Sequence, residues 1–240
     1  MKIVAVIPAY NEAATIREVA ARTLKVLPDV IVVDDGSTDH TRAELAGLPV
    51  TLISNPVNLG KGASLWRAFA LALADGADAV VTLDGDAQHR PEDIALLIDA
   101  AGAYPGRIII GARLWDRDKV PPLRYFGNRF ANFWVAWAAG FPVADSQSGF
   151  RLYPAPLLKT VRVNPEARFA FESEILIEAG RAGVRTAAVP IPALYPPHAR
   201  ASHYRSAVDT ARIVRMIAWK LAARGFDLPA LVRSLVLAKT

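Results

Sequence analysis

The sequence predicts an α/β fold in which a mostly parallel sheet is flanked by helices. In the first hundred residues, short β-branched runs alternate with stretches of helical period, an order typical of parallel strands joined by crossover helices. A chain of 240 residues is long enough for one domain with a sizeable core. Polar clusters follow several predicted strands directly, and open sheets of this kind bind ligands at the carboxyl ends of their strands.

The elements follow from the apolar periodicity. Strands are expected where apolar, β-branched residues run together, at Ile3–Ile7, Val30–Asp34, Thr51–Ser54, Ala79–Leu83 and Ile108–Gly111. Helices are expected between them, at Ala14–Val26, Asp39–Ala46, Gly62–Ala74 and Pro91–Ala101. Pro91 suits a first helical turn, and the acidic Glu92 and Asp93 follow it where the helix dipole favours negative charge.

Three further helices are expected in the second half, at Leu123–Ala139, Val208–Arg224 and Leu228–Lys239. The first carries large aromatic residues, including Trp134 and Trp137, and the second interleaves apolar residues with arginines. A stripe of this kind describes either a helix buried in the core or one lying in a membrane interface. The sequence leaves both interpretations open.

Composition excludes several classes of protein. The chain has no cysteine, which excludes disulfides, thiolate catalysis and thiolate-bound metals. No apolar run approaches the roughly 18 residues of a membrane span, and the stretch before Pro8 is expected to be a strand rather than a signal peptide. We therefore expect a soluble or peripheral protein, and a cytoplasmic setting fits the cysteine-free composition.

The charge is divided unevenly along the chain. Residues 1–100 hold 8 Lys/Arg and 14 Asp/Glu, whereas residues 101–240 hold 20 and 9. The basic second half suits phosphate, nucleic acid or an anionic membrane surface, although a merely solvated basic surface is the alternative. Because none of the usual nucleic-acid-binding modules is present, we expect no nucleic-acid partner.

The segment Val80–His89 carries the most specific chemical signal. Its apolar run ends in Asp84-Gly85-Asp86, and two carboxylates so close together repel each other. A Mg²⁺ or Mn²⁺ ion would hold both ionised, with Gln88 as a further oxygen ligand. Mg²⁺ usually takes part of its shell from substrate phosphates, so a diphosphate is the expected third party. The alternative is a plain surface turn, which Asp and Gly also favour.

Three other polar clusters follow predicted strands or precede a predicted helix: Pro8–Glu12, Asp34–Ser37 and Asn58–Gly62. An acid at a strand end can accept hydrogen bonds from a nucleobase or a ribose, and a Gly-Lys-Gly turn lets backbone and ammonium approach phosphate or sugar oxygens. The sequence lacks both Gly-x-x-x-x-Gly-Lys-Ser/Thr and Gly-x-Gly-x-x-Gly after the first strand. A phosphate loop of the kinase-like NTPase type is thereby excluded.

Together, six ordered motifs resemble those of family 2 glycosyltransferases of the GT-A fold, nearest the dolichyl- or polyprenyl-phosphate mannosyl- and glucosyltransferases. The motifs are Pro8–Glu12, Asp34–Ser37, Asn58–Gly62, Asp84–His89, Gly111–Arg113 and Asp145–Arg151. The resemblance covers roughly residues 1–210. We expect a GT-A domain over 1–205, with a nucleotide-sugar-binding half (1–112) and an acceptor half (113–205), followed by amphipathic helices over 206–240 packed on the domain or on a membrane surface.

The resemblance implies an inverting, metal-dependent transfer of a hexose from a nucleotide sugar, of the GDP-mannose or UDP-glucose type, to a polyprenyl phosphate at the cytoplasmic face of the membrane. An attacking phosphate is already ionised, so the enzyme mainly positions its substrates and neutralises the leaving diphosphate. The alternative acceptor is a soluble or other lipid hydroxyl. That acceptor would need a general base, for which Asp145, Glu172 and Glu174 are the candidates.

The resemblance also assigns positions. Those for the donor are Pro8, Tyr10, Glu12, Val33, Asp35, Lys61, Asp84 and Gly85. Those for the metal are Asp84, Asp86 and Gln88. The catalytic positions are Asp86, Arg113, Asp145 and Arg200, and those for the acceptor phosphate are Arg124, Asn128 and Arg205. The acceptor side departs from the family pattern, because Asn128 replaces a common serine and His203-Tyr204-Arg205 replaces a conventional lysine after Ser202.

Overall fold

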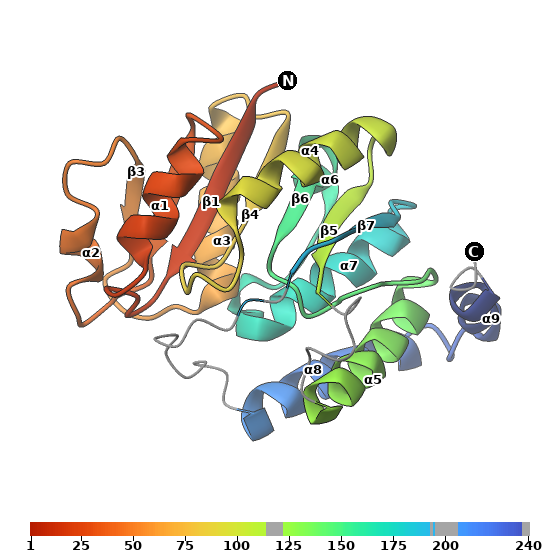
Figure 1. The fold of residues 1–240 in the computed structure, drawn as a ribbon. Coiled ribbons are helices and arrows are strands. Elements are labelled where there is room, and N and C mark those ends of the chain that lie inside the picture. The colour runs from red at the N-terminus through yellow and green to blue at the C-terminus, as the bar shows by residue number, and fades with distance from the viewer. Residues whose placement is uncertain (114–121, 193, 195–205, 237–240) are drawn as a thin grey trace.

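The computed structural model describes residues 1–113, 122–192, 194 and 206–236 (Figure 1). Within these residues seven strands form a single sheet: β1 (Ile3–Ala9), β2 (Val30–Asp34), β3 (Thr51–Ser54), β4 (Ala79–Thr82), β5 (Ile108–Ala112), β6 (Arg151–Pro154) and β7 (Thr186–Pro190). The helices are α1 (Ile16–Leu24), α2 (Thr41–Glu44), α3 (Lys61–Ala74), α4 (Ile94–Ala103), α5 (Pro122–Ala139), α6 (Ala155–Thr160), α7 (Phe171–Arg181), α8 (Ser206–Ala222) and α9 (Leu228–Val236). The described residues also form two short 3₁₀ helices, η1 (Pro91–Asp93) and η3 (Pro165–Ala170).

The predicted fold class is confirmed. The strand order is β3-β2-β1-β4-β6-β5-β7, and all neighbouring strands are parallel except β6, which runs antiparallel to β4 and β5. The five predicted strands agree with the structure to within two residues at each end. The sequence did not predict β6, β7, α6 or α7.

The reversed strand β6 determines where the second half of the chain meets the first. Thr82 at the end of β4 lies opposite Arg151 at the start of β6. The segment that leads into β6 therefore lies at the same edge of the sheet as the carboxyl ends of β1, β2 and β4. Residues 145–150 are brought there from far along the chain.

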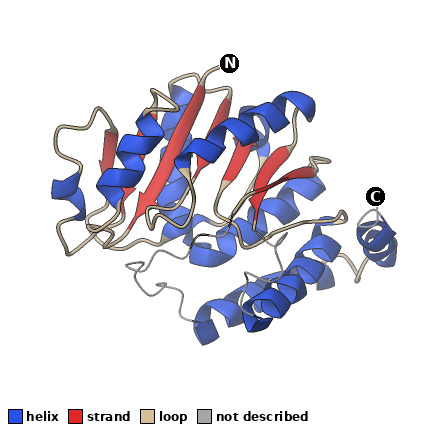
Figure 2. Cartoon of the chain, viewed as in Figure 1, coloured by secondary structure: helices blue, strands red, loops and turns tan. Residues whose placement is uncertain are grey.

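Helices cover both faces of the sheet (Figure 2). Because side chains alternate along a strand, Val4 and Val6 of β1 pack into the core under α3, α5, α7 and α8. Ala5 and Ile7 of the same strand pack into the opposite core under α1 and α4. The β1 run is apolar on both faces for this reason, as expected of a parallel strand in the middle of a sheet.

The C-terminal helices pack on the domain. Ile213, Ile217 and Leu221 of α8 are buried in the core shared with α5 and α7, and α9 lies against α5. Trp137 of α5 donates a hydrogen bond from Nε1 to the carbonyl of Asp227 at 3.0 Å, which ties α5 to the α8–α9 turn. Within the described part of the chain, no helix has the length and apolarity needed to cross a membrane.

Candidate active site

The predicted polar clusters meet at one edge of the sheet. Strands β1, β2 and β4 are adjacent and parallel, so their carboxyl ends lie side by side. The segment 145–150 reaches the same edge because β6 is antiparallel to β4. Four clusters that are separated in the sequence thus surround one region of the surface.

Hydrogen bonds join the loop after β1 to the loop after β2. Asn11, in a left-handed conformation with φ 56°, accepts a hydrogen bond on Oδ1 from the Thr38 amide at 2.8 Å. Its own amide donates to Ser37 Oγ at 2.9 Å, and the Glu12 amide donates to Thr41 Oγ1 at 2.7 Å. These bonds fix the loop that carries the predicted donor residues Tyr10 and Glu12.

Three other predicted donor positions lie in or next to β1 and β2. Pro8 is partly exposed within β1, whereas Val33 is fully buried in β2. Asp35 is buried as well, and its carboxylate accepts hydrogen bonds from the amides of Leu59 and Gly60 at 2.9 and 2.8 Å. Asp35 therefore fixes the turn that precedes Lys61, a positioning role that sequence reasoning did not identify.

The Asp84-Gly85-Asp86 turn is held from two directions. Thr15 Oγ1 donates to the Gly85 carbonyl at 2.6 Å, and the Gln88 amide donates to Asp86 Oδ1 at 3.0 Å. Burial would raise the pKa of Asp84, but the ammonium of Lys61 outweighs it and the pKa lies below its ordinary value. Burial and the Asp84 charge raise the pKa of Asp86 to about 6.

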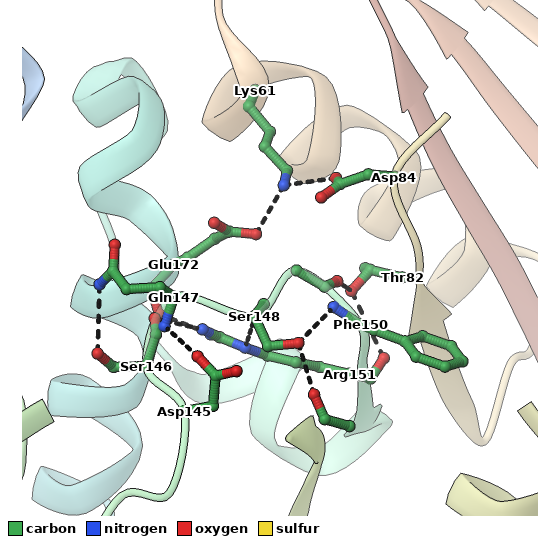
Figure 3. A network of polar contacts seen from close by, with 12 residues as sticks. Lys61, Thr82, Asp84, Asp145, Ser146, Gln147, Ser148, Phe150, Arg151 and Glu172 are labelled. Atoms are coloured by element: carbon green, nitrogen blue, oxygen red, sulfur yellow. Dashed lines mark hydrogen bonds and ion pairs between the residues drawn. The ribbon is translucent and has the colours of Figure 1, made fainter. Parts of the chain in front are cut away.

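Lys61 connects the Asp84-Gly85-Asp86 turn to helix α7 (Figure 3). From the first turn of α3, its Nζ lies 2.5 Å from Asp84 Oδ1 and 2.8 Å from Glu172 Oε1 of α7. Burial would lower the pKa of Lys61, but the two carboxylates raise it above its ordinary value. Gly149 adjoins all three groups, because a Cβ there would lie 2.7 Å from both Asp84 Oδ2 and Lys61 Nζ, and 2.9 Å from Glu172 Oε1.

Arg113 and Asp145 form a second charged pair at this edge. Asp145 is fully buried, and its Oδ2 accepts from the backbone amide and Nε of Arg113 at 3.2 and 3.0 Å. Its Oδ1 accepts from Arg113 Nη2 at 3.3 Å and from the Gln147 amide at 3.2 Å. Both oxygens are thus committed to protein donors, which makes Asp145 a weak candidate for a general base.

A buried arginine supports the segment that contains Asp145. Arg151 is fully buried and donates to three backbone carbonyls: Nε to Ser148 at 2.7 Å, Nη2 to Ser146 at 2.8 Å and Nη1 to Glu172 at 2.7 Å (Figure 3). The motif resemblance included Arg151 but gave it no role. An arginine at the start of a short apolar run was the available signal.

His89 lies in the loop that follows the Asp84-Gly85-Asp86 turn. The loop is nevertheless buried, and the His89 ring packs 5.2 Å from that of Phe150, centroid to centroid. Among the described residues His89 Nδ1 has no hydrogen-bond partner. Burial and the charge of Arg113 lower its pKa to about 4, so the ring is neutral near pH 7.

Among the described side chains, none of the predicted acceptor-phosphate residues contacts the group formed by Asp84, Lys61 and Glu172. Asn128 is half-buried in α5. Arg124 belongs to the first turns of the same helix, but its side chain lies outside the described set, and Arg200 and Arg205 lie outside the described residues altogether.

The oxygen atoms that Asp84, Asp86 and Gln88 offer suit a divalent cation whose remaining ligands come from a substrate. No three His, Asp or Glu side chains of the described residues gather as a ready-made metal site. Asp84 and Asp86 are nevertheless close enough for the charge of one to raise the pKa of the other. A cation between them would remove this repulsion, and Gln88 lies on the same turn.

Comparison with known proteins gives relatives over most of the chain. The model of the glycosyl transferase family 2 matches residues 4–156. A UDP-N-acetylglucosamine–dolichyl-phosphate N-acetylglucosaminyltransferase of Methanococcus voltae is 30% identical over 82% of this chain and 87% of that protein. The undecaprenyl-phosphate mannosyltransferase of Micrococcus luteus is 27% identical over 93% and 96%.

Solved structures agree on the fold. Glucosyl-3-phosphoglycerate synthase of Mycobacterium tuberculosis, in complex with Mn²⁺ and UDP-glucose, superposes with a TM-score of 0.66 at 24% identity. The superposition covers 93% of this chain and 78% of that chain. The two chains share the mixed α/β architecture with a mostly parallel sheet.

Proposed function

The chain belongs to glycosyl transferase family 2, and on that premise we propose that it transfers a hexose from a nucleotide sugar to a polyprenyl phosphate, with inversion at the anomeric carbon. The observation that carries the proposal is the Asp84–Asp86 pair at the end of β4, beside the cross-linked loops of β1 and β2. Two relatives named for transfer to dolichyl or undecaprenyl phosphate support the acceptor class.

On the donor side, residues 1–112 bind the nucleotide sugar. Pro8, Tyr10, Glu12, Val33 and Asp35 form or support the nucleoside site. Asp84, Asp86 and Gln88 hold Mg²⁺ or Mn²⁺, and Gly85 gives the turn its shape. When bound, the cation supplies the positive charge that stabilises the leaving diphosphate.

On the acceptor side, residues 113–205 position the attacking phosphate, with Arg113, Arg124, Asn128, Arg200 and Arg205 as the proposed contacts. A phosphate oxygen attacks without a general base, because it is ionised near pH 7. Guanidinium groups suit such an acceptor, since they donate bidentate hydrogen bonds to phosphate.

The side chains that could act as a base are engaged elsewhere, which favours a phosphate acceptor over a hydroxyl. Asp145 accepts from Arg113 and Gln147, and Glu172 pairs with Lys61. Glu174 pairs with Lys220 at 2.8 Å. A hydroxyl acceptor would require one of these carboxylates to release its partner first.

We further propose that helices α8 and α9, together with α5, face the cytoplasmic surface of an anionic membrane. Phe130 of α5 is 62% exposed and Trp219 of α8 is 73% exposed, and Figure 1 draws the two helices side by side. On α8, Arg212 and Arg215 are exposed on the same side as Trp219, at helical spacings of three and four. Exposed aromatics beside arginines suit an interface with anionic lipids.

A calorimetric screen tests the donor site. UDP, GDP and their hexose conjugates are titrated with and without Mn²⁺, into the wild type and into Asp86→Ala. We expect one nucleotide to bind tightly only with Mn²⁺, and this binding to be lost in Asp86→Ala. Failure of every nucleotide to bind would contradict the proposed donor site.

A transfer assay then tests the acceptor. The donor found above is supplied with a polyprenyl phosphate or with the corresponding polyprenol, in anionic or in neutral vesicles. We expect transfer to the phosphate alone, and sedimentation of the protein with anionic vesicles that weakens in Trp219→Ser. Leu71→Ser, on exposed Leu71 of α3, is the matched control for the vesicle assay. Preferred transfer to the polyprenol would favour the hydroxyl alternative.

A further inference from the structure

We propose that Lys61 is a resident cation of the metal site: its ammonium neutralises Asp84 until a divalent cation takes its place, and Glu172 retains the displaced ammonium. This inference rests on the proposed function, because it concerns the metal that the donor requires. It assigns a positioning role to Glu172, which the sequence offered as a candidate general base.

The geometry makes Lys61 a competitor for the metal. Its Nζ lies 2.5 Å from Asp84 Oδ1, so it contacts one of the two carboxylates that would bind the cation. The contact is tightly enclosed by the backbone of Gly149, where even a Cβ atom would collide with the side chains of Asp84, Lys61 and Glu172. A metal ion that binds Asp84 through the same oxygen must therefore displace the ammonium.

Glu172 gives the displaced ammonium a partner. The side chains of Lys61 and Glu172 are only 15% and 10% exposed, and an unpaired charge at such a depth is strongly destabilising. Glu172 lies in the first turn of α7, and its backbone carbonyl accepts from Arg151. Lys61 can thus leave Asp84 without becoming an unpaired buried charge.

The charges of the cluster also balance only with a divalent cation present. Asp84, Asp86 and Glu172 contribute three negative charges when ionised, whereas Lys61 contributes one positive charge. A divalent ion neutralises the remainder. An ammonium shared between Asp84 and Glu172 partly neutralises the same group while no metal is bound.

A double-mutant cycle tests the competition directly, with Mn²⁺ alone as the probe and electron paramagnetic resonance of free Mn²⁺ as the readout. Lys61→Met removes the competitor, so we expect about tenfold tighter Mn²⁺ binding, as one lost charge contact of this kind implies. Glu172→Gln removes the alternative partner of Lys61, so we expect about three- to tenfold weaker binding.

The double variant separates competition from through-space electrostatics. Under competition, Glu172 acts only through Lys61, so Lys61→Met/Glu172→Gln should bind Mn²⁺ as tightly as Lys61→Met. Independent through-space effects would add, and the double variant would bind Mn²⁺ within about threefold of the wild type. Additivity within about twofold would overturn the inference while leaving the proposed function intact.

Lys220→Met is the matched control. Lys220 is similarly buried and also bridges two carboxylates, Glu174 at 2.8 Å and Glu178 at 2.5 Å, both on the same helix as Glu172. It should leave the Mn²⁺ affinity within about twofold of wild type. Thermal melting verifies that each variant is folded. If Lys61→Met does not fold, the Mn²⁺ affinity of the double variant, which has one buried carboxylate fewer, is compared with that of the wild type instead.

The remaining outcomes distinguish this inference from the proposed function. Mn²⁺ binding by Lys61→Met but not by the wild type would be the strongest form of the expected result. Equal Mn²⁺ affinity of the wild type and Lys61→Met would refute the competition between Lys61 and the metal, and would leave the proposed function intact. If the wild type and all the variants fail to bind Mn²⁺, the proposed metal-dependent transfer fails together with the inference.

Discussion

Replacement of Arg151 by methionine tests the internal support of the site. The guanidinium donates to the buried carbonyls of Ser146, Ser148 and Glu172 at 2.7–2.8 Å. Methionine fills much of the same volume but donates no hydrogen bond, and each buried acceptor left without a donor costs about 1–3 kcal/mol. Partial relaxation, and relief from burying a charge, reduce the sum, so we expect a loss of about 3–5 kcal/mol.

Such a loss would be a large share of the stability of a domain, which is usually about 5–15 kcal/mol. Urea unfolding followed by tryptophan fluorescence measures it, and Arg42→Met, at an exposed position of α2, is the control, with an expected change within about 0.5 kcal/mol. Arg151→Lys should fall between the two, because one ammonium cannot reproduce the fork of the guanidinium. A loss below about 1 kcal/mol in Arg151→Met would refute a stabilising role for the three buried hydrogen bonds.

Three further predictions concern packing and the metal site. Gly180→Ala should lower the melting temperature, because its Cβ would collide with the backbone oxygen of Ala139 and force α7 away from α5, whereas Gly102→Ala, with open space in α4, should not. Gly149→Ala should keep the fold but reduce transfer at least about tenfold, since its Cβ displaces only the ends of flexible charged side chains; wild-type activity would contradict this. Chelation with EDTA should abolish nucleotide binding in calorimetry, and added Mn²⁺ or Mg²⁺ should restore it; unchanged binding would refute the proposed metal dependence.

The parallel half of the fold was predictable because its signals are local. The β-branched runs of β2 and β3 have the predicted limits, and β1, β4 and β5 differ by only one or two residues. Strands β6 and β7 were missed for different physical reasons. Strand β6 is a four-residue strand that begins with a buried arginine, and β7 contains two alanines and ends in proline, so neither carries a strong apolar run.

The helices show the same limit at their ends. Helix α1 is shorter than predicted by two residues at each end. At its start, residues 12–15 form a turn in which the Thr15 and Ile16 amides both donate to the Glu12 carbonyl. The aromatic helix α5 is in part a core helix, and contact of its exposed aromatic residues with a membrane stays a prediction. Val135 and Ala138 are buried in the core, whereas Phe130 and Phe133 are exposed.

The strand ends that make up the proposed donor half were predictable from the sequence, but the contacts of each acid were not. Asp35 and Asp86 both follow a buried apolar strand in the sequence. The carboxylate of Asp35 accepts hydrogen bonds from the amides of Leu59 and Gly60. Burial and the charge of Asp84 instead raise the pKa of Asp86 to about 6. Only tertiary contacts distinguish an acid that holds a loop from one that is available to a cation.

The antiparallel strand β6 explains why both halves of the chain contribute residues to the candidate site. Since β6 pairs with β4, the segment before it brings Asp145 and Gly149 next to the metal motif, and α7 then brings Glu172 within 2.8 Å of Lys61. Lys61 in turn contacts Asp84, so a residue of the donor half is held by both halves. Under the proposed competition, a cation that binds Asp84 through Oδ1 would displace the Lys61 ammonium toward Glu172 of α7. The proposal therefore predicts that metal binding in the donor half changes a contact of α7 through a single buried ammonium.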